Sequence, residues 1–153
     1  MPTVEIVDET SRFPLTDELR GVLVDLLNEA GHAGDEVTVV LVDDEAIAAL
    51  NLRDRGVNGP TDVLSYPTYE PTDVGFPTVP HLGDVIISLD TAARQAADVD
   101  HSLALEVVTL AAHGLTHLRG FDHQSAADWA PFEEAQARAR LLFTRLGTDG
   151  ART

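Results

Sequence analysis

The sequence predicts a single α/β domain with a mixed sheet of about four strands, mostly parallel with one antiparallel strand, and about five helices. Three observations lead to this class. Segments rich in β-branched residues alternate with segments of helical periodicity along the first half of the chain. Two strand-like segments, 61–66 and 82–89, are joined by one long loop and could pair antiparallel. The segment 102–118 is apolar nearly all round, which indicates a helix at the centre of the domain.

Each element is expected from a local pattern. Strands are predicted at 3–7, 36–42, 61–66 and 82–89. Helices are predicted from an N-cap at Thr16 to Gly31, from 44 to 52 after a cap at Asp43, from a cap at Asp90 to about 99, from 102 to 118, and from 125 to 146 with an interruption near Pro131. Glycines and a proline indicate a loop at 53–60. Four prolines between 67 and 81 indicate a long loop that could serve as a lid, and we expect the tail after about 147 to be disordered.

Composition limits the classes of function. The 153 residues include no cysteine, which excludes disulfides and thiolate metal ligands and leaves histidine and carboxylate as the strong metal-binding side chains. The net charge of −16 argues against a protein that attracts DNA or RNA over long distances, so any contact with RNA must depend on a local group of arginines. No signal peptide or membrane span is recognisable, so we expect a cytoplasmic protein with neither DNA nor a membrane as its partner.

Three of the six histidines lie between positions 113 and 123, and they are the strongest functional signal in the sequence. His113 and His117 stand at i and i+4, so on a helix their imidazoles share one face. Gly120 can adopt the positive φ that ends a helix, after which His123 can return towards the same point. Three imidazoles with an open coordination position are typical of a catalytic zinc site, although nickel, copper and iron also accept nitrogen ligands.

This spacing also matches H-E-x-x-H-x-x-G-x-x-H, the metal-binding pattern of the metzincin proteases. The glutamate that acts as general base in those proteases is replaced here by Gly114, which cannot accept a proton. Metzincins also have a methionine turn beneath the metal, whereas the only methionine in this chain is Met1. The pattern therefore predicts a metzincin-like metal-binding helix without the other residues that a peptidase needs.

Residues 113–123, which read HGLTHLRGFDH, resemble the H-G-x-L-H-L-x-G-[YF]-D-H signature of the YbeY family of rRNA-maturation endoribonucleases, with Thr116 in place of a leucine. Residues 50–67 resemble a second motif of that family, L-N-x-x-[YF]-R-x-x-[DN]-x-P-T-D-V-L-S-F-P. Asp54 replaces the aromatic residue of this motif and Val57 replaces a frequent lysine, which lowers the positive charge beside the arginine. Residues 82–88 resemble L-G-D-I-x-I-S, so the motifs follow the family order.

The resemblance implies that His113, His117 and His123 bind one metal ion, with zinc favoured over other divalent transition metals. It implies that Arg55, on the loop before the third strand, is a catalytic residue that offsets charge on the phosphate oxygens. It also implies a single-strand-specific endoribonuclease of rRNA 3′-end maturation and ribosome quality control, with rRNA and the ribosome or its associated proteins as partners. Zinc could lower the pKa of a bound water to about 7, or it could hold the phosphate while a ribose 2′-hydroxyl attacks; the sequence leaves both open.

Two other functions remain open from the sequence. One is a metal-dependent hydrolase of another substrate, including peptides, and the other is a non-catalytic, ribosome-associated module in which the metal only stabilises the fold. Arg53 and Arg119 could extend the positive patch, and Asp122 could either support a histidine ligand or cap the turn through its own side chain. The remaining histidines are expected to be structural or solvated: His32, His81 and His101.

Overall fold

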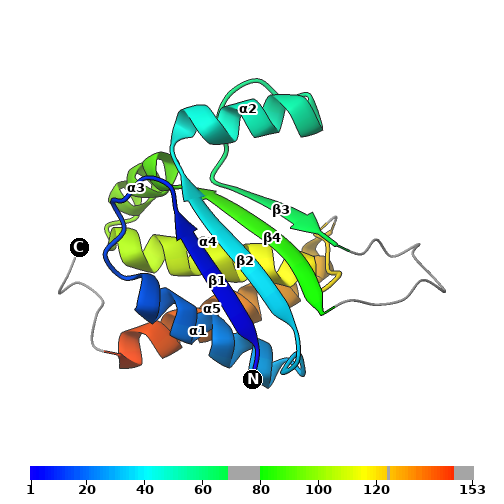
Figure 1. Ribbon diagram of the computed structural model, residues 1–153. Coiled ribbons are helices and arrows are strands. Elements are labelled where there is room, and N and C mark those ends of the chain that lie inside the picture. Colours follow the sequence, from blue (N-terminus) through cyan, green and yellow to red (C-terminus); the bar gives the residue numbers. More distant parts are fainter. Residues whose placement is uncertain (69–79, 124, 147–153) are drawn as a thin grey trace.

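The computed structural model describes residues 1–68, 80–123 and 125–146, and in it one four-stranded sheet carries helices on both faces (Figure 1). The strands are β1 (Thr3–Asp8), β2 (Glu36–Val42), β3 (Val63–Pro67) and β4 (His81–Ser88), and their order in the sheet is β1-β2-β4-β3. β2 lies parallel to both β1 and β4, whereas β3 lies antiparallel to β4 at the edge of the sheet. The mixed sheet predicted from the sequence is confirmed, including its single antiparallel pair.

Five α-helices accompany the sheet, as the sequence predicted. They are α1 (Thr16–Glu29), α2 (Asp44–Arg55), α3 (Leu89–Asp98), α4 (Leu103–Leu118) and α5 (Ala130–Arg145), and a 3-10 helix, η1 (Ala126–Trp129), precedes α5. In Figure 1, α1, α4 and α5 lie on one face of the sheet and α2 lies on the other. Within the described part of the chain, none of the helices has the length and apolar character needed to cross a bilayer.

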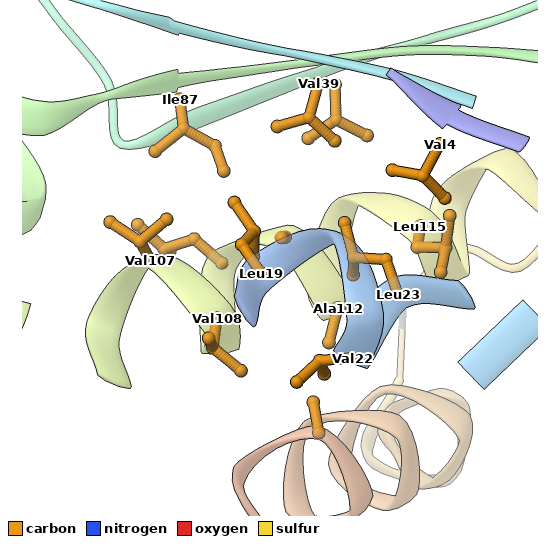
Figure 2. Packing of buried hydrophobic residues seen from close by; sticks show 14 of the residues in the cluster. Val4, Leu19, Val22, Leu23, Val39, Ile87, Val107, Val108, Ala112 and Leu115 are labelled. Carbon is orange, nitrogen blue, oxygen red and sulfur yellow. The ribbon is translucent and has the colours of Figure 1, made fainter. Parts of the chain in front are cut away.

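The main core lies between the sheet and the layer formed by α1, α4 and α5. α4 is buried on most sides because it contacts β3 and β4 as well as α5. Figure 2 shows how Val107 and Ala112 of α4 face side chains of α1 and the sheet, including Leu19 and Val39. The helix that carries His113 and His117 is therefore packed against its neighbours on most of its sides.

A second, smaller cluster of buried residues lies under α2 on the opposite face of the sheet. Its fully buried members are Val42, Ile47, Leu64 and Ile86. Of the apolar members, Ile47 is the one buried residue that comes from α2, and Ala46 and Leu50 of the same helix pack half-buried against the cluster. α2 is thus attached to the sheet by a narrow contact.

Two of the predicted helix caps are wrong. Leu15 occupies the N-cap of α1, so Thr16 is already the first helical residue. α3 is capped by Ser88, whose hydroxyl accepts a hydrogen bond from the backbone N–H of Thr91 at 3.2 Å. Asp90 instead forms an ion pair with an arginine from the loop after β1. Both positions carry good capping side chains one or two residues away from the real cap, so the local pattern alone did not distinguish them.

The helix α2 is longer than predicted, and this changes the position of Arg55. The predicted loop was expected to begin at Arg53, but the helix continues to Arg55 and ends at Gly56, whose φ is +69°. Arginines in the last turn are favourable because they lie near the negative end of the helix dipole. Arg55 is therefore the last residue of a helix, not part of a loop.

The last helical segment also differs from the prediction. The expected interruption near Pro131 is the boundary between η1 and α5, since Pro131 lies in the first turn of α5. The predicted lid between 67 and 81 falls largely on residues 69–79, and the predicted disordered tail falls on 147–153; both lie outside the described residues.

Candidate metal centre

The C-terminal end of α4 presents His113 and His117 on the same face of the helix. The helix then ends in a turn in which the N–H of Gly120 donates to the carbonyl of His117 at 2.9 Å. The N–H of Phe121 donates to the carbonyl of Thr116 at 3.4 Å, and Gly120 has a φ of +97°. This is the hydrogen-bond pattern of a glycine-terminated helix, and it reverses the chain in the way that the sequence predicted.

The turn brings His123 next to the two helical histidines. One imidazole nitrogen from each of His113, His117 and His123 lies within 4.8 Å of the others, and all three side chains are half-buried. The ring centroids are 4.9 to 5.3 Å apart. Three converging imidazole nitrogens could hold a transition-metal ion, so the residues present fit the group that their spacing suggested.

Hydrogen bonds orient two of the imidazoles. His117 Nδ1 lies 3.1 Å from the carbonyl oxygen of Phe121, and a carbonyl can only accept, so Nδ1 carries the proton and Nε2 is left with a free lone pair. His113 Nδ1 lies 3.0 Å from the amide nitrogen Nε2 of Gln136, on α5. As placed, the Gln136 NH2 donates to Nδ1. With the amide group turned over by 180°, its oxygen would accept from Nδ1–H, and His113 would then also offer Nε2 to a metal.

Aromatic rings from the segment after the turn form the floor of the cluster. Phe132 is fully buried, and its ring centroid lies 4.7 to 4.9 Å from the centroids of all three imidazoles. Trp129 stacks on His123, with ring centroids 4.1 Å apart and an angle of 12° between the planes. The histidines therefore lie against an apolar surface instead of bulk water.

This environment keeps His113 and His117 neutral. Burial, together with the two neighbouring histidines, lowers the pKa of His113 to about 4. Burial also lowers the pKa of His117, although its hydrogen bond to the carbonyl of Phe121 acts in the opposite direction. Metal ions bind only the neutral form of imidazole, so these two side chains are in the binding form at neutral pH.

The cluster opens into a cavity of about 540 Å³ between α4, β3 and the end of α2. The residues that line this cavity are Arg55, Thr61, Asp62, Val63, Leu64, Ser65, Pro67, His113, His117, Gly120, Phe121, Asp122 and His123. The structure therefore brings Arg55 and the three histidines, which the sequence separates by more than fifty residues, to the walls of one cavity.

Arg53 and Arg119 do not extend the positive patch into this cavity. Asp54 holds Arg53 with two hydrogen bonds of 2.7 and 2.9 Å and also accepts one of 2.7 Å from the hydroxyl of Tyr66. The guanidinium of Arg119 lies over the ring of Phe121, 5.2 Å from its centroid. Among the described residues, Arg55 is the one arginine that lines the cavity.

The carboxylates and the other histidines have structural partners. Asp122 accepts a hydrogen bond of 2.8 Å from the backbone N–H of His123, which supports the turn-capping interpretation of this residue. Asp62 accepts one of 2.7 Å from the backbone N–H of Val63.

As predicted, the other three histidines have structural roles, since each contacts a carboxylate: His32 with Asp35 at 2.8 Å, His81 with Asp84 at 3.0 Å and His101 with Glu106 at 2.6 Å.

Comparison with known proteins assigns the family. A family model described as Endoribonuclease YbeY matches residues 5–142. Endoribonuclease YbeY of Deinococcus radiodurans is 49% identical over 137 residues, covering 82% of this chain and 87% of that protein. Endoribonuclease YbeY of Thermus thermophilus is 49% identical over 128 residues, covering 84% of this chain and 91% of that protein.

The chain belongs to the YbeY family. Endoribonuclease YbeY of Moorella thermoacetica is a more distant relative, with 43% identity over 145 residues, 86% of this chain and 90% of that protein. The solution structure of TM1509 from Thermotoga maritima has the same fold, with a TM-score of 0.67 and 24% identity over 95% of this chain and 94% of that one.

Within this YbeY chain, Gly114 has a packing role that the sequence did not reveal. A Cβ atom at this position would lie 2.6 Å from Cγ1 of Val85 and 3.1 Å from Oγ of Ser65. Position 114 therefore faces the sheet at very close range, and only glycine lets α4 approach β3 and β4 as it does. The hydroxyl of Ser65 also donates to the carbonyl of Gly114 at 3.3 Å across this contact.

Three residues around the histidines were missed from the sequence: Trp129, Phe132 and Gln136. Their spacing of i, i+3 and i+7 is that of one helical face, although Trp129 is the last residue of η1 and the other two lie on α5. This spacing was the available signal, because it predicts that they face the same neighbour. Nothing in the spacing identified that neighbour as the histidine cluster.

Proposed function

We propose that this chain is a metal-dependent endoribonuclease that cleaves single-stranded RNA during rRNA 3′-end maturation and ribosome quality control. The observation that carries the proposal is a cavity lined both by three imidazoles and by Arg55, whose guanidinium has no ion pair among residues 1–68, 80–123 and 125–146. Membership of a family whose relatives are named Endoribonuclease YbeY supports RNA as the substrate.

We infer that His113, His117 and His123 hold one zinc ion through their Nε2 atoms. The donor set favours this assignment, because three imidazoles with a free position suit zinc, and no thiolate is available. When bound, zinc supplies a Lewis acid next to the scissile phosphate and lowers the pKa of water. The protein supplies the orientation, through the Phe121 carbonyl and the Gln136 amide behind two of the rings.

Arg55 is assigned to the phosphate. A guanidinium can donate two parallel hydrogen bonds to two phosphate oxygens, and it stays charged at every working pH. Its position at the end of α2 fixes its backbone. The neighbouring carboxylate, Asp54, accepts a hydrogen bond from the hydroxyl of Tyr66 instead of pairing with Arg55. Arg55 would therefore bind the non-bridging oxygens and stabilise the charge that builds on them in the transition state.

A peptidase is less well supported than a nuclease. The general base of a metzincin would have to stand at position 114, and its side chain would have to pass through the contact with Val85 and Ser65. The described walls of the cavity offer Asp62 and Asp122 as carboxylates, but both accept hydrogen bonds from backbone N–H groups. The site thus favours chemistry in which the protein orients a phosphate.

The acidic surface supports a partner-assisted encounter with RNA in the cytoplasm. With a net charge of −16 and one arginine at the described cavity wall, the protein repels free RNA at a distance. We therefore propose that rRNA is reached on the ribosome or together with ribosome-associated proteins. Free single-stranded RNA should be bound weakly, with a shallow dependence on salt because few phosphates are neutralised.

The nuclease proposal is tested with two neighbouring arginines. Purified metal-loaded protein is expected to cleave single-stranded rRNA fragments, and Arg55→Ala should lower kcat by about 10²–10³-fold, as expected when a charge-stabilising donor is removed. Arg53→Ala is the matched control, because Arg53 lies on the same helix turn but is bound by Asp54 and does not line the cavity. No cleavage by the wild type, or equal losses in the two variants, would refute the proposal.

The metal assignment is tested separately by elemental analysis of the purified protein. We expect about one equivalent of zinc in the wild type. His117→Ala should lose most of the metal, whereas His32→Ala should keep it because His32 pairs with Asp35 away from the cluster. Equal metal content in the two variants would contradict the assignment of the ligands.

A further inference from the structure

The exposed aromatic side chains of the described residues are concentrated at the metal centre. Phe13, Phe132 and Phe143 are buried, whereas Phe121 is 40% exposed and Trp129 is 38% exposed. Phe121 lines the cavity; Trp129 is not itself a lining residue, but it stacks on His123, which is. An isolated exposed aromatic residue is common on protein surfaces, but two beside one cavity call for a functional explanation.

Trp129 has the geometry of a stacking platform. Its indole is nearly parallel to the imidazole of His123, so one face of the ring is covered. Trp129 is nevertheless 38% exposed, so part of the indole remains accessible beside the covered face. A planar group placed on the face opposite His123 would extend the imidazole–indole stack by one layer, beside the candidate metal centre.

The charges around the site explain why such a platform would be needed. Five arginines are engaged in ion pairs with carboxylates: Arg12, Arg20, Arg53, Arg94 and Arg138. Arg119 lies over Phe121 outside the cavity lining, which leaves Arg55 as the described cation of the cavity. Even with a metal ion at the histidines, one arginine contact provides little affinity for a strand that the net charge repels, so uncharged contacts are needed as well.

We propose that Trp129 binds one unpaired nucleobase of the RNA substrate by stacking, on the face opposite His123. The inference rests on the proposed nuclease function and adds a base subsite next to the phosphate subsite of Arg55. Stacking on an aromatic ring requires no particular base, because every base has a π-face. It does require that the base is free of its helix, so the same contact selects single-stranded over double-stranded RNA.

Trp129 is the only tryptophan of the chain, so its fluorescence reports directly on the subsite. The metal-loaded protein is titrated with a 2′-O-methyl oligonucleotide of about eight nucleotides, within the length range of one single-strand site. We expect the emission of Trp129 to be quenched as the oligonucleotide binds. An abasic oligonucleotide of the same length is the control probe, and it should bind more weakly and leave the emission unchanged.

Kinetics with variants tests the same contact independently. Trp129→Leu should raise KM for single-stranded RNA about tenfold, in line with the loss of one stacked base, while kcat changes little. Trp129→Phe should restore most of the affinity because it keeps an aromatic face. Leu141→Ala is the matched control, since Leu141 is a similarly exposed apolar residue of α5 but, unlike Trp129, has no aromatic ring to stack on a base or on His123.

Because Trp129 also covers His123, the metal content of each variant is measured alongside KM. The proposed base subsite would be refuted if KM rose equally in Trp129→Leu and Trp129→Phe and if this rise followed the loss of metal. Oligonucleotide binding, seen by anisotropy of a labelled strand, with unchanged Trp129 emission would overturn it as well, although the nuclease proposal would stand. Absence of any RNA binding and cleavage by the wild type would instead refute the nuclease function itself.

Discussion

Replacing Gly114 with alanine is expected to destabilise the protein, whereas the same replacement at Gly21 is expected to stabilise it. Both glycines lie inside α-helices, α4 and α1, so the intrinsic change in helix propensity is the same. At position 114 the new methyl group would lie 2.6 and 3.0 Å from the two γ-carbons of Val85. Val85 is fully buried and β-branched, so it has no free rotamer with which to move away.

The magnitude follows from two opposing terms. An alanine in place of glycine in a helix gains about 1 kcal/mol. Forcing a methyl group into a packed contact costs about 1–3 kcal/mol, and a contact this short belongs at the upper end of that range. We therefore expect Gly114→Ala to lose about 1–2 kcal/mol of unfolding free energy. At Gly21 no atom lies within 4 Å of the new Cβ, so the gain of about 1 kcal/mol remains.

Urea denaturation and thermal melting of chelator-treated protein measure these changes without a contribution from bound metal. For a chain of this size each kcal/mol corresponds to about 2–4 °C in Tm, so the two variants should shift in opposite directions. In the double variant with Val85→Ala, the cost of Gly114→Ala should fall by at least about 1 kcal/mol, because the two side chains are in contact. A Gly114→Ala protein as stable as the wild type, or additive effects in the double variant, would refute the packing argument.

Two further predictions concern the groups behind the site. Gln136→Ala should weaken zinc binding about 10–100-fold, because His113 loses the partner of its Nδ1. Competition with a chromogenic chelator measures this affinity, and Gln136→Glu should keep most of it. The pKa of Asp54 is lowered to about 2 by hydrogen bonds from Arg53 and then Tyr66, so Tyr66→Phe should raise it, as followed by NMR of the carboxyl group. Since the folded pKa lies below the ordinary 3.8, this contribution to stability is complete above pH 3.8, is lost towards pH 2, and should be smaller in the variant.

A specific result would refute each of these two predictions. Equal zinc affinity of Gln136→Ala and the wild type would mean that the amide contact does not orient His113. Gln95→Ala serves as the control for the first, because Gln95 contacts Asp62 instead of a histidine. An unchanged pKa of Asp54 in Tyr66→Phe would show that Arg53 alone accounts for the shift.

The histidine cluster could be predicted because its information is local. His113 and His117 are related by the helical repeat, and Gly120 marks the turn, so the approach of His123 needs no knowledge of the remaining chain. The alternation of strands and helices is local in the same way, and the long loop between two strand-like segments indicated the antiparallel pair, although the order β1-β2-β4-β3 was not predicted. Such features, which depend on residues close together in the chain, can be predicted from the sequence alone.

The rest of the site depends on contacts between distant segments. Phe132 and Gln136 reach the histidines only because α5 packs on α4, and helix–helix packing leaves no sign at the positions that meet. Arg55 was identified through a family motif, but its helical setting depends on where Gly56 ends α2. The packing role of Gly114 likewise becomes visible only when Val85 is placed opposite it.

The separation of the two hydrophobic cores has a consequence for motion. The histidines belong to α4, in the large core, whereas Arg55 belongs to α2, which is attached through the small cluster around Ile47. Regions with few buried apolar contacts open at a lower free-energy cost than the global unfolding, so amide hydrogens of α2 should exchange with solvent well before those of α4. A local opening of α2 would therefore move Arg55 away from the histidines while α4 stays folded, so the proposed phosphate contact could be released without disturbing the proposed metal ligands.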